Sequence, residues 1–245
     1  MSAEGALMFA RFAYPPDELG YAGAATATSM RMPGAIAEIE RRARRFDGAW
    51  VHLEFLAEVL ENDDPLSEEI VETYWIGSDL LYEVDSRTLV TRLEKKLVGQ
   101  GEGVGGTWRH ARARAMAHHS FQVYEVEPWA AQLRSGEQPR SAVSSLNGCR
   151  IRSGVVTDVD GEWVTATTQL LAWDGARMFE QAPGLERARW AVDGRTLMEK
   201  PPVVGDVVAL HWDWVCGVLT MTQAMRIDAL EAAQRAAVGL DGRPH

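Results

Sequence analysis

The chain has 245 residues, of which 46% are hydrophobic and 24% are charged, and its formal net charge is −10. This length can bury a substantial core as one large or two small domains. The negative balance argues against a nucleic-acid partner, because phosphate binding needs clustered Lys and Arg. No apolar run reaches the roughly 20 residues of a membrane span, and the first residues lack the basic stretch and cleavage site of a signal peptide. We therefore expect a cytoplasmic protein without a membrane partner, whose two cysteines are free thiols.

Helical periodicity dominates the first part of the chain. Apolar residues recur there at spacings of three and four, which is typical of amphipathic helices. Asp85 or Ser86 is suited to cap the last of these helices. The predicted helices span residues 33–46, 48–61, 64–84 and 87–97.

Two further segments separate this helical part from the second half of the chain. The glycine-rich stretch 99–106 predicts a flexible break, and residues 118–129 predict a strand or short extended piece that runs into a turn of helix. Residues 1–135 are therefore predicted to form a mainly helical domain, with its boundary in the polar stretch 134–145.

Three segments of the first half each have two interpretations. Residues 14–21, which include Pro15 and Pro16, have the rigidity of a recognition loop but also suit a turn that ends a helix. The basic stretches 40–45 and 107–119 are typical of solvated faces, or of patches that dock an acidic partner or an anion.

Beyond Gly148 the pattern is that of short strands. Asp-Gly pairs at residues 160–161, 174–175 and 193–194 indicate tight hairpin turns, since such turns need positive φ. Residues 205–216 predict one more strand, and Thr220 or Thr222 then caps a final helix that Gly239 ends. The chain is thus predicted to be α+β, with a small β-barrel and a terminal helix in residues 148–240.

Two segments of this second part carry a resemblance. The run from Cys149 to Val156, CRIRSGVV, resembles the opening of the HypC/HupF family of nickel-iron hydrogenase maturation chaperones. The run GDVVALH, which ends at His211, resembles the second signature of that family. The whole chain is also similar to an uncharacterised family that shares the segments FARFAYPP, YWIG and LHWDWVC and is associated with hydrogenase genes.

The resemblance implies a β-barrel that binds a metal fragment. In the HypC/HupF family a cysteine and a histidine carry the iron cyanide/carbonyl fragment of the hydrogenase active site, and these roles would fall on Cys149 and His211. The implied partners are the hydrogenase large subunit or other maturation proteins.

The residue types suit the same chemistry. A thiolate and an imidazole bind soft or borderline metals, and two ligands are fewer than the four of a structural zinc site. Such an under-filled site suits a carrier, and donors that share one ion are expected within about 5 Å of each other. The alternatives are that Cys149 is a packing residue and His211 a hydrogen-bonded structural histidine.

Strand alternation predicts the neighbours of these residues. Asp213 is expected on the same face as His211, where its carboxylate would orient the imidazole. Arg150 and Arg152 are expected on the face opposite Cys149, directed toward solvent or a partner.

The remaining candidates are aromatic and histidine side chains. Trp212 and Trp214 are expected to form an apolar packing face or, as the second interpretation, an interface or pocket. His118 and His119, with His110 upstream, form a loose cluster that suits an interface or pocket, with metal ligation as the minority interpretation. Cys216 is expected in the core.

Two functions are consistent with these patterns. The first is a hydrogenase maturation chaperone that binds or relays an iron fragment and a client protein. The second is a small-molecule-binding protein or enzyme with a tryptophan-lined pocket between the two domains. The sequence contains no phosphate-binding glycine loop, nucleophile elbow or H-E-x-x-H motif, and it therefore favours a binding protein over an enzyme.

Overall fold

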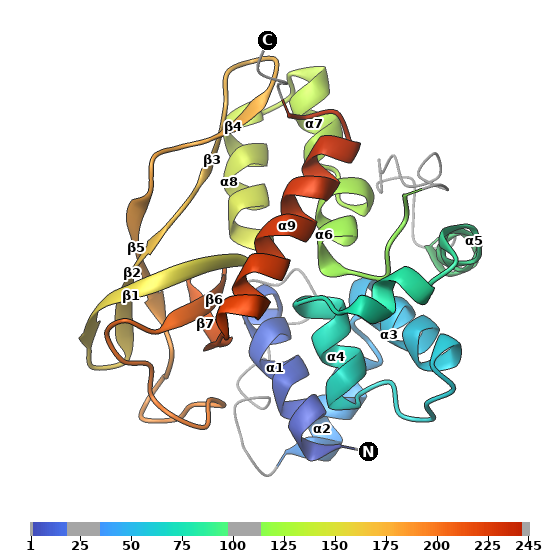
Figure 1. Ribbon diagram of the computed structural model, residues 1–245, viewed down its shortest axis with the longest axis horizontal. Coiled ribbons are helices and arrows are strands. Elements are labelled where there is room, and N and C mark those ends of the chain that lie inside the picture. The colour runs from blue at the N-terminus through green and yellow to red at the C-terminus, as the bar shows by residue number, and fades with distance from the viewer. Residues whose placement is uncertain (1, 19–34, 98–113, 242–245) are drawn as a thin grey trace.

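The computed structural model describes residues 2–18, 35–97 and 114–241. It is an α+β fold in which N-terminal helices precede a five-stranded β-barrel and a C-terminal helix (Figure 1). The predicted fold class is confirmed. The predicted flexible break at 99–106, His110 and most of the basic stretch 107–119 lie outside the described residues.

The elements of the first part are α1 (Ala3–Glu18), α2 (Ile36–Ala43), α3 (Asp47–Val59), α4 (Glu68–Trp75), the 3₁₀ helix η2 (Asp79–Glu83), α5 (Ser86–Leu97), α6 (His119–Phe121), the π-helical turn η4 (Gln122–Val126), α7 (Trp129–Ser135) and α8 (Pro139–Cys149). Those of the second part are β1 (Arg152–Asp160), β2 (Trp163–Thr168), β3 (Leu171–Trp173), β4 (Met178–Glu180), β5 (Gly184–Arg189), β6 (Val207–His211), β7 (Trp214–Val218) and α9 (Met221–Ala237).

The four predicted helices correspond to α2, α3, α4 with η2, and α5. The strand predicted within residues 118–129 is wrong, because this segment forms α6 and η4. The side chain of His118 accepts a hydrogen bond from the backbone N–H of Ser120 at 3.1 Å and so caps α6. This local cap and burial of the segment outweigh the strand preference of its aromatic and β-branched residues.

The barrel closes in the strand order β1-β2-β5-β7-β6, with β6 paired back to β1. All pairs are antiparallel except β5 with β7. The predicted tight turns are present, since β1 and β2 form a hairpin around Gly161, and β3 and β4 form another around Gly175. The single strand predicted over residues 205–216 is instead two strands, β6 and β7, joined at Trp212 and Asp213.

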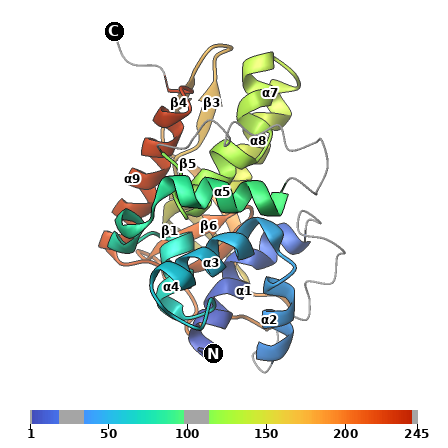
Figure 2. The ribbon, with the colours of Figure 1, turned by 90° about the vertical axis from the view of Figure 1, so that its right-hand side faces the viewer.

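Both faces of β6 are buried, one inside the barrel and one against the helices, and His211 at its end contacts the helix α1 through the Phe12 carbonyl. Val208 and Leu210 belong to the core inside the barrel, whereas Ala209 packs in the larger core shared with the helices. That larger core contains residues of α1, α3 and α4 together with Trp214 and Cys216 of β7. The barrel and the helical part are therefore joined by a common hydrophobic core, and Figure 2 shows the helices gathered against the barrel.

The helix α8 occupies the segment in which the boundary between the two parts was predicted. Pro139 at its first turn suits a helix start, and the helix continues to Cys149 before β1 begins. Cys149 is thus the last residue of a helix rather than part of a strand. The predicted final helix is α9, where Thr220 and Gln223 form a reciprocal capping box.

None of the helices in the described ranges has the length and apolar character needed to cross a bilayer.

Candidate metal centre

Three side chains that can bind a metal meet between the barrel and the helices. Cys149 ends α8, His119 begins α6 and His211 ends β6, and one potential donor atom from each lies within 4.8 Å of the others. We call these three residues the donor trio. Bonds of about 2.0 Å to nitrogen and 2.3 Å to sulfur limit the separation of two donors on one ion to about 4.3 Å, so a small side-chain adjustment suffices.

Both imidazoles of the trio are oriented by backbone carbonyls. Nδ1 of His211 lies 2.7 Å from the carbonyl oxygen of Phe12, and Nε2 of His119 lies 2.8 Å from the carbonyl oxygen of Cys149. A carbonyl only accepts, so these two nitrogens must carry the protons. The lone pairs are then on Nε2 of His211 and Nδ1 of His119, which is the arrangement of most metal-binding histidines.

Neither lone pair has a strong hydrogen-bond partner. Nε2 of His211 is buried beside the backbone of Cys149, with no hydrogen-bond partner of normal geometry. Nδ1 of His119 meets the hydroxyl of Tyr74 at 3.5 Å, which is long for a hydrogen bond. A metal ion that binds these two nitrogens would therefore break no strong hydrogen bond.

Burial sets the protonation of the trio. It lowers the pKa of His119 to about 4 and the pKa of His211 well below its usual value, with His119 adding to the second shift. Both imidazoles are therefore neutral at neutral pH, as ligation requires. Burial, followed by Glu127, raises the pKa of the Cys149 thiol well above its usual value, so the thiol must release its proton when it binds a metal.

The segments that carry Cys149 and His211 are bonded to each other. The backbone N–H of Trp212 donates to the carbonyl of Gly148 at 2.7 Å. A Cβ atom at position 148 would lie 2.4 Å from Cε3 of Trp212, so only glycine permits this approach without a shift of the ring. Arg152 spans the same junction, because Nη1 donates to the carbonyl of Asn147 at 3.0 Å and Nη2 to that of Trp212 at 2.8 Å.

The expectation that Arg150 and Arg152 point to solvent or a partner is wrong, since their exposed fractions are 6% and 5%. Alternation along a strand does not apply to Cys149 and Arg150, which precede β1. Both guanidiniums are satisfied by acceptors, as buried charges require. Nε of Arg152 is paired with Glu186 at 2.8 Å, and Arg150 donates to the carbonyl of Gln169.

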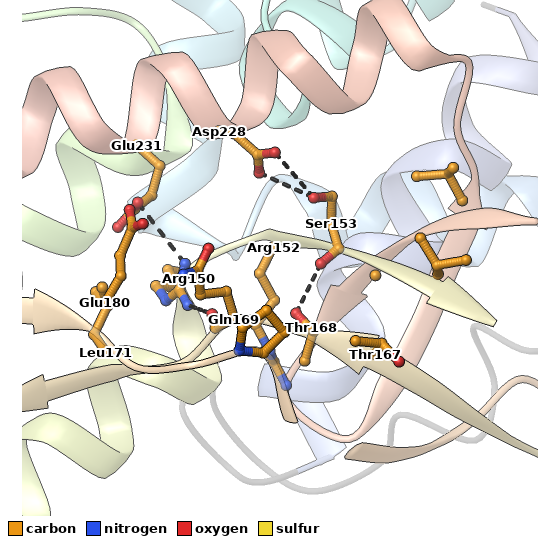
Figure 3. A pocket seen from close by; sticks show the side chains of 14 residues that line it. Arg150, Arg152, Ser153, Thr167, Thr168, Gln169, Leu171, Glu180, Asp228 and Glu231 are labelled. Carbon is orange, nitrogen blue, oxygen red and sulfur yellow. Dashed lines mark hydrogen bonds and ion pairs between the residues drawn. The ribbon is translucent and has the colours of Figure 1, made fainter. Parts of the chain in front are cut away.

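Arg150 also connects the trio to α9. Its Nη1 lies 3.8 Å from Glu231, which in turn accepts hydrogen bonds from Tyr124 and Arg235. Figure 3 shows Glu231 and Asp228 directed from α9 toward Arg150 and Ser153, along a cavity of about 360 Å³. This network fixes the backbone directly after Cys149.

The other predicted site residues lie around the trio without joining it. His118 is buried and caps α6. Trp214 is buried and packs on Tyr14, with ring centroids 4.9 Å apart, and Trp212 is half-buried at the turn. Cys216 is fully buried, as predicted for a core residue.

Asp213 does not have the predicted place beside His211. It is exposed in the turn between β6 and β7, because the strand ends at His211 and alternation stops there. The acceptor for Nδ1 of His211 is the Phe12 carbonyl instead.

Sequence patterns did not indicate that three of the residues around the donor trio belong to the candidate site. Phe12 acts through its backbone and Tyr74 through a hydroxyl inside a predicted helix, and neither belongs to a ligand motif. Arg152 was recognisable only as a charge three residues after the cysteine. His119 did carry a signal, as one of two adjacent histidines.

Comparison with known proteins places the chain in a family but assigns no activity. Searches of curated proteins and of solved structures gave no significant match. One family model, described as a family of unknown function, DUF6390, matches residues 1–241. This match covers nearly the whole chain, and the protein therefore belongs to the DUF6390 family.

Proposed function

We propose that the protein is an accessory or assembly chaperone for nickel-iron hydrogenase maturation. In this role it binds an iron-containing active-site fragment at Cys149, His119 and His211 and passes it to the hydrogenase large subunit or another maturation protein. The observation that carries the proposal is the donor trio, with its donor atoms within 4.8 Å of one another and both imidazole tautomers set by carbonyls.

The chemistry of the trio suits a transient cargo. Three protein donors leave room for further ligands on the metal, and an iron fragment that brings cyanide and carbon monoxide needs only a few bonds from the protein. The two neutral imidazoles lose no proton on binding, whereas the Cys149 thiol must release one. Protonation of the Cys149 thiolate favours release of the iron fragment, so the cysteine allows the fragment to be transferred to a partner.

The sequence resemblance supplies the identity of the cargo in this proposal. The signatures around Cys149 and His211 resemble those of the HypC/HupF family, and the two residues meet in the fold. The third donor, His119, comes from the helical part, which gives this part a role in the same site.

The proposal is tested by purifying the protein without oxygen from a host that makes nickel-iron hydrogenase. We expect bound iron and infrared bands of cyanide and carbon monoxide, both lost in Cys149→Ala. Cys216→Ala is the matched control, because it removes the other free thiol, which lies outside the trio, and should keep the bands. Zinc without these bands, or a Cys149→Ala strain with full hydrogenase maturation, would refute the proposed cargo.

The second candidate, a small-molecule-binding protein, is favoured by one cavity of about 640 Å³ between α7, α8 and the β3–β4 hairpin. Its volume is that of typical ligand sites, and its wall includes Trp173, Leu133 and Val143 with Arg140 at the edge. A thermal-shift screen of aromatic carboxylates tests this function. Stabilisation of the wild type that is lost in Trp173→Ala would support it, and no stabilisation by any compound would count against it.

A further inference from the structure

Two consecutive prolines lie near the end of α1, within the segment first interpreted as a recognition loop or helix-ending turn. In an α-helix each carbonyl accepts a hydrogen bond from the N–H four residues later, and proline has no N–H to donate. Pro15 therefore removes the usual donor for the carbonyl of Arg11, and Pro16 removes the one for the carbonyl of Phe12. Both prolines lie inside the helix, Ala3–Glu18.

The carbonyl that Pro16 leaves without its usual donor is the one that orients His211. Phe12 is 1% exposed and His211 is fully buried, so water does not replace the missing bond. The Nδ1–H group of His211 donates to this carbonyl at 2.7 Å. A buried carbonyl is costly unless it accepts a hydrogen bond, and the imidazole supplies the bond that the helix lacks.

We infer that Pro16 is a positioning residue of the metal centre. By freeing the Phe12 carbonyl it holds His211 in the tautomer with the proton on Nδ1, and so leaves Nε2 unprotonated and able to bind a metal. Its role in metal binding rests on the proposed function, whereas its effect on the tautomer does not.

The neighbouring proline provides a matched control. Pro16→Ala restores an N–H that competes with His211 for the Phe12 carbonyl. Pro15→Ala makes the same chemical change one residue earlier, where the restored N–H faces the carbonyl of Arg11. A purely structural role for the prolines would give both variants the same phenotype.

The tautomer is measured directly by nitrogen-15 NMR of the metal-free, full-length protein, with the His211 signals assigned by their loss in His211→Gln. We expect the Nδ1–H form in the wild type and in Pro15→Ala, and a mixture of tautomers in Pro16→Ala. Pro16→Ser restores the same N–H with another side chain and should give the same mixture. Retention of the Nδ1–H form in both Pro16 variants, or an equal change in Pro15→Ala, would overturn the inference.

Titration with Co²⁺ separates this inference from the proposed function. Loss of an orienting partner typically weakens metal binding about 10- to 100-fold, so we expect this loss in Pro16→Ala and wild-type affinity in Pro15→Ala. Wild-type protein that binds no Co²⁺ would refute metal binding, while a tautomer shift confined to the Pro16 variants would still establish the positioning role. Equal Co²⁺ affinity of Pro16→Ala and the wild type would overturn the part played by Pro16 in metal binding.

Discussion

Replacement of Arg152 is expected to weaken the junction between the two segments that carry Cys149 and His211. Its guanidinium is 5% exposed and makes bonds of 2.8 Å to Glu186, 3.0 Å to the Asn147 carbonyl and 2.8 Å to the Trp212 carbonyl. Removing one partner of a buried ion pair costs about 3 to 5 kcal/mol. Because the Glu186 side chain is 25% exposed and can be rehydrated, we expect a loss of about 3 kcal/mol in Arg152→Ala.

Urea unfolding followed by circular dichroism measures this loss as a lower midpoint at unchanged slope. Arg152→Lys should lose nearly as much, since one ammonium group cannot reproduce the planar set of donors. Arg177→Ala is the control, because this arginine forms an exposed pair with Asp174 that contributes about 0 to 1 kcal/mol. A loss below about 1 kcal/mol in Arg152→Ala would show that the carbonyls are hydrated without the arginine.

Two further substitutions distinguish the packing around the trio from the trio itself. Gly148→Ala places a Cβ 2.4 Å from the Trp212 ring and is expected to lower the free energy of unfolding by about 1 to 3 kcal/mol. Gly184→Ala is the control, because its Cβ meets nothing within 4 Å, and it should have the melting temperature of the wild type. Equal melting temperatures for the two variants would contradict the predicted clash. His118→Ala removes the cap bonded to the Ser120 N–H, at a cost of about 1 kcal/mol, and should leave Co²⁺ affinity unchanged in a titration. A large loss of affinity would show that His118 belongs to the site.

Features of the fold that depend on neighbouring residues were predictable from the sequence. The Asp-Gly turns and the Thr220 cap of α9 involve groups at most three residues apart, and the structure has them where the patterns indicated. The segment after His118 shows the limit of such patterns. Its aromatic and β-branched residues favour a strand, but burial against distant helices and the histidine cap determine a helical conformation.

The candidate site was predictable only in part, for the same reason. The proximity of Cys149 and His211 was expected from paired signatures, whereas the orientation of their neighbours was inferred from strand alternation. That inference failed for Arg150 and Asp213, because Cys149 ends a helix and Asp213 lies in a turn, so both residues lie just beyond a strand end, where alternation no longer applies. It also failed for Arg152, which lies in β1 but is buried by its bonds to Glu186 and to the carbonyls of Asn147 and Trp212.

The helical part contributes to the candidate metal centre. Cys149 ends α8 and His211 ends β6, and the bond from the Trp212 N–H to the Gly148 carbonyl joins these two elements. His211 takes its tautomer from the carbonyl of Phe12 in α1. The third donor, His119, belongs to α6, and its own proton is held by the Cys149 carbonyl. Carbonyls of two helices, α1 and α8, therefore orient both imidazoles of the trio. Only His211 among the three donors comes from the barrel, so a metal that binds all three would stabilise the contact between the barrel and the helices, and a partner that separates them would remove the bond to His211.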